Sequence, residues 1–201
     1  GPAVKTLIVG LLPDVSLKSV ETLAQSTYTR VIDSIGLNDP RRPDEQVDAI
    51  VRYSPELVLI AGGVDGGATY SIQKVLEIIG LAAYLLPEPK RPAVLYAGNQ
   101  ALKREVQNAL NGIATSVQVT PNIRPSLEVE DLAPAQRELA NIMVNVRQRQ
   151  MPELSELRLL SGGIVLPSAY AQGRMVRFLA SYFNTGKGVL SVDVGASAIS
   201  M

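Results

Sequence analysis

The 201-residue chain contains no cysteine and no histidine. These two absences exclude a thiolate nucleophile, a disulfide, an imidazole base and the usual zinc ligands. Oxygen atoms are the metal ligands that remain. Any metal ion that the chain holds is therefore expected to resemble Mg²⁺ and to be bound by carboxylate and phosphate oxygens.

An excess of charge of one sign is also missing. The chain has 19 basic and 19 acidic residues, and like charges follow one another only in pairs such as Arg41-Arg42. Nucleic acids and anionic membranes select basic patches, so neither is expected as a partner. No stretch approaches the roughly 18 apolar residues of a membrane span, and we expect a cytoplasmic protein.

The stretch that organises the chain is residues 56–67, ELVLIAGGVDGG. Its apolar run is typical of a strand that is covered on both faces, as in the centre of a parallel sheet. Four glycines and Asp65 follow, and a helical pattern then covers residues 71–84. A strand that opens through glycines onto a helix leaves backbone N–H groups at the carboxyl edge of the sheet, where open α/β sheets bind ligands.

Strand-like and helical patterns alternate through the first 120 residues. With the organising strand there are five strand-like segments, and four helical patterns separate them. This alternation predicts a doubly wound parallel sheet of the Rossmann or flavodoxin-like α/β class over residues 3–120. The other four expected strands are residues 6–12, 31–37, 93–97 and 116–119.

The pattern changes after Thr120. A proline-punctuated stretch breaks the alternation, so residues 121–201 are expected to form a mainly helical segment that ends in a strand. That strand, residues 188–194, runs into the sequence Asp193-Val-Gly-Ala-Ser197. No neighbouring strands of its own are expected for this strand. We therefore expect it to pair with the edge of the first sheet or with a second copy of the chain, which would give a homodimer.

The glycine loop has two interpretations. In the first, the N–H groups of Gly62, Gly63, Gly66 and Gly67 hold a phosphate or a carboxylate, and Asp65 binds Mg²⁺ or a ribose hydroxyl. In the second, the loop is a tight turn in which Asp65 caps the next helix and the glycines permit positive φ. The loop matches neither a Walker loop nor the dinucleotide fingerprint.

Three further groups of residues have the same two kinds of interpretation. Asn99 ends the neighbouring strand, so it either projects toward Asp65 or simply caps a helix, and the cap is favoured. The cluster formed by Asn122, Arg124 and Arg137 either binds an anion or, as we favour, pairs with nearby acids such as Glu128 and Glu138. In the Asp-x-Gly-x-Ser pattern, Asp193 is a candidate catalytic and Mg²⁺-binding residue, while the turn with Gly195 and Ser197 can bring backbone amides to phosphate.

Several motifs together resemble one family, the MutL-like component of glutamate mutase, in the actin/Hsp70/sugar-kinase ATPase superfamily. Residues 59–67, LIAGGVDGG, are similar to the family's LLAGGTDGG, and residues 94–99, VLYAGN, are similar to its VxxAGN. Residues 122–125 and 134–137, NIRP and PAQR, are similar to its NVxP and EPAR segments. Residues 190–197, LSVDVGAS, stand where the family has LxVDVGGATTD. The order and spacing of the motifs agree over most of the chain.

The resemblance implies an ATP-dependent companion or reactivator of a cobalamin-dependent mutase such as glutamate mutase. ATP and Mg²⁺ would be cofactors of the full-length protein. In the last motif Ala196 replaces a glycine, and Ala198 to Ser200 replace two threonines and an aspartate, so hydroxyls that would touch phosphate are lost. The family's first phosphate motif, DxGST, would lie upstream of Gly1. We therefore expect an internal fragment that performs little or no catalysis alone.

Two other functions stay open. One is a free-standing α/β module, flavodoxin-like or similar to a periplasmic sugar-binding lobe, that holds a small ligand or anion at the Asp65 loop. The other is a structural or interaction module whose ligand site has decayed. A cobalamin domain that ligates cobalt through histidine is excluded, because the chain has none.

Overall fold

The computed structural model describes residues 3–67, 69–151, 153–166, 168–183, 186, 188–194 and 199–200. The chain divides into two compact units, Gly1–Ile142 and Met143–Met201. In the described part of the chain, no helix is both long enough and apolar enough to cross a membrane.

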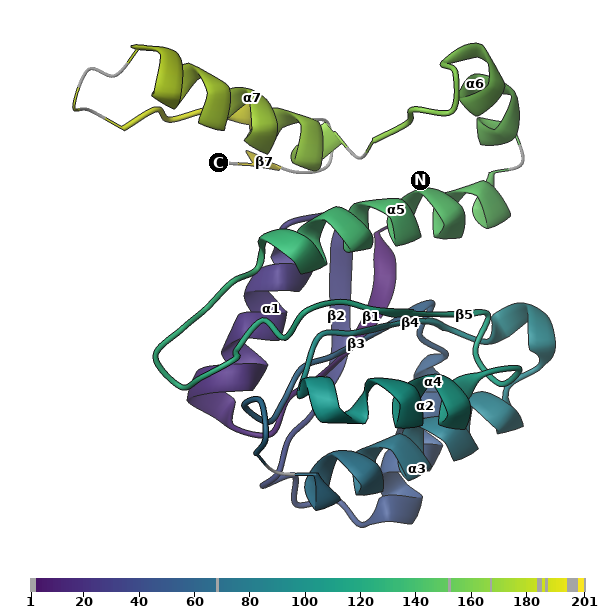
Figure 1. Cartoon of the computed structure of the whole chain (residues 1–201). Helices are drawn as coiled ribbons and strands as arrows, with labels where there is room; N and C mark the ends of the chain where they lie inside the picture. Colours follow the sequence, from purple (N-terminus) through teal and green to yellow (C-terminus); the bar gives the residue numbers. More distant parts are fainter. Residues whose placement is uncertain are drawn as a thin grey trace. The chain divides into compact units, whose positions relative to one another are not determined.

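A five-stranded parallel sheet forms the centre of the first unit (Figure 1). The strand order is β2-β1-β3-β4-β5. This is the doubly wound, flavodoxin-like order, so the predicted fold class is confirmed. The organising strand lies in the middle of the sheet, and all four of its residues are buried. The strands are β1 (Val4–Val9), β2 (Thr29–Ile35), β3 (Leu57–Ile60), β4 (Ala93–Tyr96) and β5 (Ser116–Val119).

Helices cover both faces of this sheet (Figure 1). The chain moves in one direction from β1 to β2 and in the opposite direction from β2 through β5. Because crossovers between parallel strands are right-handed, this reversal places the first helix on one face and the next three on the other. The helices are α1 (Lys18–Gln25), α2 (Pro43–Tyr53), α3 (Tyr70–Leu85) and α4 (Lys103–Leu110).

Alternate residues of β3 supply the two sides of the core. Val58 and Ile60 belong to the apolar cluster between the sheet and helices α2 to α4. Leu57 and Leu59, which are equally buried, point to the opposite face because side chains alternate along a strand. Full burial of one such side chain contributes about 1.5–3 kcal/mol relative to exposure. The unbroken apolar run is therefore explained by a strand that is buried on both faces.

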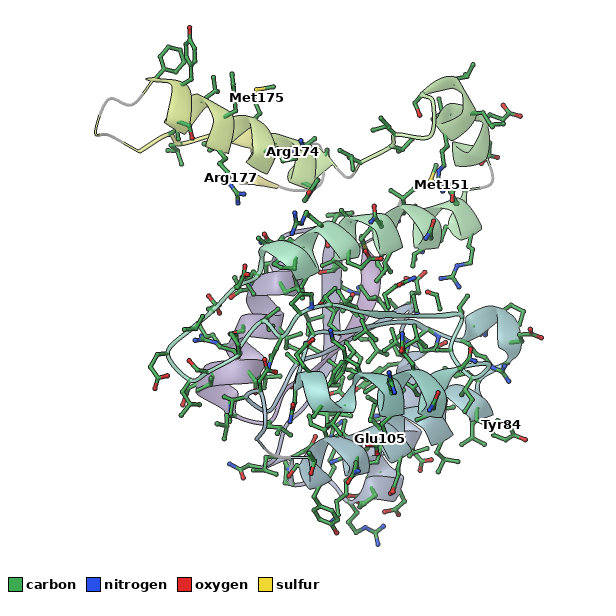
Figure 2. The ribbon with its side chains drawn as sticks, viewed as in Figure 1. Tyr84, Glu105, Met151, Arg174, Met175 and Arg177 are labelled. Carbon is green, nitrogen blue, oxygen red and sulfur yellow. The ribbon has the colours of Figure 1, made fainter. Side chains whose placement is uncertain are left out.

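Helix α3 carries large apolar side chains on both of its sides. Its inner side is buried, through residues such as Ile72 and Ile79. Its outer side carries large apolar side chains in solvent, including Tyr84, which projects from the surface of the unit (Figure 2). Three short turns complete the connections: η1 (Pro13–Leu17), η2 (Glu88–Lys90) and η3 (Gln100–Leu102).

The segment after β5 remains part of the first unit. The Ile123 N–H donates to the Ala97 carbonyl at 3.0 Å, and the Ile123 side chain is fully buried. Helix α5 (Ala133–Gln150) follows, and residues 133–142 of it still belong to this unit. The boundary expected near residue 120 therefore lies inside a compact unit.

Beyond the end of α5, the described part of the second unit contains two helices and a small sheet. They are α6 (Leu154–Leu160), α7 (Ser168–Phe183), β6 (Asp193–Val194) and β7 (Ile199–Ser200). The terminal strand was expected to cover residues 188–194 and to pair with the first sheet or a second copy. Instead, only Asp193–Val194 is strand, and it pairs antiparallel with Ile199–Ser200. Pairing between segments that are close in sequence closes a short loop, which costs less entropy than reaching a distant edge.

Candidate functional site

Three loops meet at the carboxyl edge of the sheet. They follow β3, β4 and β5, which are adjacent and parallel, so their carboxyl ends lie together. Asn122, from the third loop, bridges to the first. Its Nδ2 donates to the Gly63 carbonyl and to Asp65 Oδ1, both at 3.0 Å. The structure thus brings the glycine loop and the NIRP segment into one site.

Asp65 is fixed by two of these loops. Its Oδ1 accepts from the Gln100 N–H at 3.0 Å as well as from Asn122, and its own N–H donates to the Pro125 carbonyl at 3.1 Å. The proposed cap on the following helix is wrong, because α3 has Thr69 at its N-cap position. Instead, the carboxylate binds the first amide of the helical turn that follows β4. Asp65 Oδ2 has no hydrogen bond to a described residue, and the residue is exposed.

Asn99 caps the helical turn that follows β4, as favoured, and it also binds the glycine loop at Gly66 and Gly67, not at Asp65. The side chain is 0% exposed. Its Oδ1 accepts from the Ala101 N–H at 3.0 Å, which caps η3, and from the Gly66 N–H at 3.3 Å. Its Nδ2 donates to the Gly67 carbonyl at 3.3 Å. A buried amide with three partners locks the glycine loop to the end of β4.

Tyr96 holds the backbone of Asn99 through a hydrogen bond. Its hydroxyl donates to the Asn99 carbonyl at 2.9 Å. Burial raises the pKa of Tyr96 far above its ordinary value, and the charges of Asp65 and Glu105 raise it further. The hydroxyl is therefore a permanent donor in the physiological pH range.

Two glycines are required by the geometry of the site. A Cβ at Gly98 would lie 2.7 Å from the Gly62 carbonyl oxygen, so the backbones of the first two loops approach too closely for any side chain. Gly66 has φ of +74°, in the left-handed region that glycine adopts without strain. The close approach and the positive φ explain why this edge is rich in glycine.

The site offers one carboxylate oxygen and a few backbone donors. Gly63 and Val64 are half-buried, and their N–H groups donate to no acceptor in the described residues. No group of three or more acidic residues with metal-binding spacing occurs in the described part of the chain. Asp65 can therefore supply one ligand to a hydrated Mg²⁺, whose other ligands would be water and phosphate oxygens. The amides can hold an anion.

Comparison with known sequences decides the family. Residues 1–200 match the model of the MutL protein family. The chain belongs to this family. It is 22% identical over 196 residues to Protein MutL of Clostridium tetanomorphum, and the alignment covers 96% of this chain and 40% of that relative. The resemblance to MutL is thus confirmed, and the chain spans less than half the length of this relative.

In this MutL-family chain, Asn122, Arg124 and Arg137 do not converge on an anion site, which was the less favoured of their two interpretations. The Arg124 side chain turns away from Asn122 toward α1, where its Nε donates to Ser19 Oγ at 2.7 Å and its Nη2 lies 3.2 Å from Glu130. Ser19 Oγ also donates to Glu130 at 2.6 Å. Arg124 therefore pairs with an acid, as favoured, although the acid is Glu130. Arg137 is exposed on α5 and has no polar contact with a described residue.

The last motif of the MutL resemblance belongs to the second unit. Asp193 lies in β6, opposite Ser200. Its side chain lies outside the described part of the structure, as do Gly195 and Ser197. Their predicted roles in metal and phosphate binding remain predictions.

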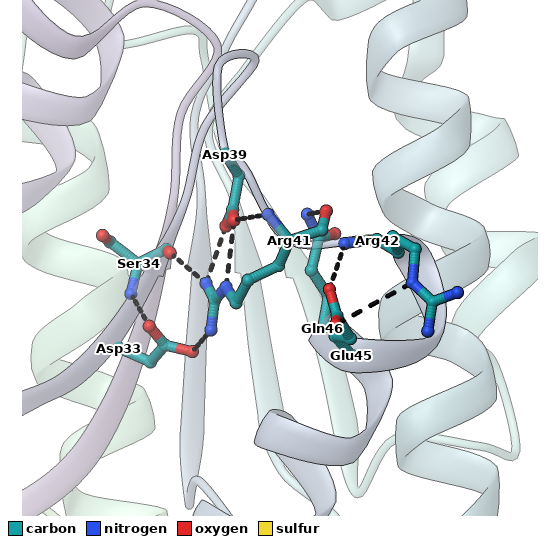
Figure 3. Close-up of polar contacts among 7 residues, drawn as sticks. All are labelled: Asp33, Ser34, Asp39, Arg41, Arg42, Glu45 and Gln46. Atoms are coloured by element: carbon teal, nitrogen blue, oxygen red, sulfur yellow. Dashed lines mark hydrogen bonds and ion pairs between the residues drawn. The ribbon is translucent and has the colours of Figure 1, made fainter.

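The same sheet edge holds an ion cluster that sequence reasoning missed (Figure 3). Arg41, in the loop between β2 and α2, lies 2.6 Å from a carboxylate oxygen of both Asp33 and Asp39. Its Nη2 also donates to the Ser34 carbonyl at 2.9 Å. Hydrogen bonds from Arg41 lower the pKa of Asp39, and both acids raise the pKa of Arg41. The sequence signal that could have indicated this ion cluster is the Asn38-Asp39-Pro40 turn directly before Arg41.

Proposed function

We propose that this chain is the nucleotide-site and partner-binding part of a MutL protein that assists a cobalamin-dependent mutase such as glutamate mutase. The role is that of a companion or reactivator, so the chain itself turns over no mutase substrate. The family relationship supports the proposal, and the arrangement of Asp65 carries the site assignment. One of its oxygens is fixed by two loops, while the other faces solvent.

ATP with Mg²⁺ is the ligand that this arrangement fits best in the full-length protein. Asp65 would hold the ion through one oxygen, and the Gly63 and Val64 amides would hold phosphate. The ion would neutralise charge on the phosphates. The residues of this chain fix the position of the carboxylate, because Gln100 and Asn122 hold it from two directions.

The nucleotide assignment is tested by calorimetric titration of MgATP and MgADP into the full-length protein and into this chain. Asp65→Asn keeps an oxygen for Gln100 but removes the charge. It is expected to weaken Mg²⁺-nucleotide binding about tenfold or more, the effect of losing one contact to a charged group. Asp48→Asn, at an exposed acid on α2, is the matched control and should leave affinity unchanged. Equal affinity in both variants would refute the role of Asp65.

The partner assignment needs a separate experiment. Purified glutamate mutase carrying inactivated cobalamin is mixed with the full-length protein and MgATP, and recovery of mutase activity is followed. Recovery that requires the MutL protein and nucleotide is the expected result. This chain alone is expected to hydrolyse no ATP, since phosphoryl transfer in the ATPase superfamily that its motifs resemble needs phosphate loops from two lobes around the ion. Hydrolysis by the chain that Asp193→Ala abolishes would contradict the second expectation.

One observation favours a second candidate function, in which the carboxyl edge of the sheet has a purely structural role. Most polar groups of Asp65, Asn99 and Asn122 are already hydrogen-bonded within the protein. In that case neither the chain nor the full-length protein would bind nucleotide. A free-standing ligand module would instead bind its anion tightly in the short chain. The same titrations therefore separate the three functions.

A further inference from the structure

An open groove of about 600 Å³ lies between α3 and α4 in the first unit. Glu77 on α3 and Glu105 on α4 line its two walls. Glu105 accepts a hydrogen bond from Gln73 at 2.8 Å, and neither carboxylate forms an ion pair with a described residue. Lys74 also lines the groove, and its ammonium lies 4.6 Å from the centre of the Tyr70 ring. The lining thus carries two carboxylates and one ammonium group, an excess of negative charge.

Apolar side chains surround these carboxylates. Tyr70, Leu81, Tyr84 and Leu85 all project into solvent from the outer side of α3, and Tyr84 is 66% exposed. Lys74 and Glu77 lie among them on the exposed side of α3, and the inner side of the helix is buried in the core. A cluster of large apolar side chains in solvent marks an interaction site.

Gly80 forms the floor of the groove. It lies in the middle of α3, where glycine costs about 0.5–1 kcal/mol relative to alanine. A Cβ at this position would meet only Leu110 Cδ2, at 3.8 Å, so the protein's own packing does not require glycine. Glycine here does leave the helix backbone open to close approach by another element.

Helix α7 of the second unit has the complementary chemistry. Met175, Phe178 and Tyr182 recur at the spacing of one helix face, and all three are exposed. The rings of Phe178 and Tyr182 stack with centroids 5.9 Å apart, and Phe178 is 60% exposed. Arg174 and Arg177 project from the same helix (Figure 2). Residues 157–192 contain four basic residues and no acidic residue.

We propose that α7 of one copy of this chain docks into the α3–α4 groove of a second copy. The Met175–Phe178–Tyr182 stripe covers the outer face of α3, and the backbone of α7 approaches α3 at Gly80. Arg174 and Arg177 supply positive charge that pairs with Glu77 and Glu105. Methionine, aromatic residues and arginine are the side chains enriched in protein interfaces. Two reciprocal contacts of this kind close a two-fold dimer.

Charge complementarity favours a second copy over a membrane as the occupant. A helix that lies on an anionic membrane carries many lysines and arginines on its polar face. In α7 that face holds only two arginines beside serines and Gln172. The groove, in contrast, provides a carboxylate for each arginine. The proposal is independent of the glycine-loop site and of nucleotide binding.

The test uses the full 201-residue chain and a pair of charge-reversed variants. One variant carries Arg174→Glu and Arg177→Glu, and the other carries Glu77→Arg and Glu105→Arg. Analytical ultracentrifugation should show that the unaltered chain dimerises and that each variant alone associates at least about tenfold more weakly. An equimolar mixture of the two should form a 1:1 complex, because the first keeps a native groove and the second a native α7. Arg104→Glu, an exposed reversal on α4 outside the groove lining, should have no effect.

Apolar variants test the contact without changing charge. Phe178→Ala should weaken the dimer about tenfold. Gly80→Leu should abolish it by filling the groove while preserving the helix, as circular dichroism would verify. Ser181→Ala is the control on α7 and should change nothing. A chain that stays monomeric throughout the micromolar range, a mixture that forms no complex, or monomeric chains that bind phosphatidylserine vesicles through Phe178 would each overturn the proposal.

Discussion

The two units of the chain differ in where their apolar side chains lie. In the first unit, all four residues of β3 and most of the inner faces of α2, α3 and α4 are buried. Among the described residues after Ile142, the buried apolar side chains are Met143 and Val146. Large side chains of α6 and α7, such as Leu160 at 85% exposure, lie in solvent.

This difference shows that local helical structure and a buried core are separate properties. Helix α7 is as long as α3, yet α3 has an inner face buried against a sheet, while the described residues of α7 include exposed large apolar side chains and none that is fully buried. Most helical stability in proteins comes from packing an apolar face. We therefore expect the first unit to be stable by itself and the second to be stabilised by contact with other protein surface.

The largest expected effect on the free energy of unfolding comes from a substitution at the centre of the core. Leu59 is 0% exposed in the central strand, so Leu59→Ala should lower the free energy of unfolding by about 2–5 kcal/mol through lost burial and a new cavity. Leu160→Ala, at the exposed counterpart in the second unit, should change it by less than about 0.5 kcal/mol. Urea unfolding of both variants measures the contrast. Equal losses would mean that Leu160 is buried in solution.

A second prediction concerns the close approach of the Gly98 and Gly62 backbones in the site. Gly98→Ala places a Cβ against the Gly62 carbonyl, so it should destabilise the first unit by about 1–3 kcal/mol through overpacking. The same change should increase hydrogen exchange at the Gly66 amide, because the lock formed by Asn99 is displaced. Unchanged stability together with unchanged exchange at that amide would show that the loops separate easily.

The third prediction uses two adjacent arginines. Arg41 is clamped by Asp33 and Asp39, whereas Arg42 pairs with Asp44 at the exposed surface. Arg41→Gln should cost about 1.5–3 kcal/mol at pH 7, and Arg42→Gln should cost less than about 1 kcal/mol.

The Arg41 effect should depend on pH with a definite sign. Arg41 lowers the folded-state pKa of Asp39, so its contribution is present above the unfolded pKa of about 4 and is lost as pH falls through the folded pKa. The stability difference between the unaltered chain and Arg41→Gln should thus be constant between pH 5 and 7 and should shrink below about pH 4. A difference that grows in acid would contradict this assignment. Denaturant unfolding at pH 7 and pH 3 measures it.

The smallest expected effect is a gain in the second unit. Gly173 lies inside α7, where an added Cβ would meet no atom within 4 Å. Gly173→Ala should stabilise the helix by about 0.5–1 kcal/mol because alanine loses less backbone entropy. Hydrogen exchange in α7 should slow, while exchange in β3 stays the same. Faster exchange in α7 would indicate that Gly173 contacts another surface.

Some of the site could be predicted because its signals are local. The glycines and Asp65 follow directly from a buried strand, and Asn99 occupies the equivalent place after β4. Their partners could not be predicted in the same way. Gln100 lies 35 residues from Asp65 and Asn122 lies 57 residues from it. Such contacts depend on strand order, and a one-step change of order would separate them.

The sequence by itself determined the class of this protein, its central strand and the family to which it belongs. Unbroken apolar runs, helical periodicity and motif spacing are properties of neighbouring residues, so they can be seen without coordinates. Only the tertiary structure decided that Asp65 binds the next loop instead of its own helix, and that Arg124 pairs with Glu130 instead of forming an anion site. In each case several residues of similar chemistry could serve as the partner. The order of the strands in the sheet decides which of them comes within hydrogen-bonding distance.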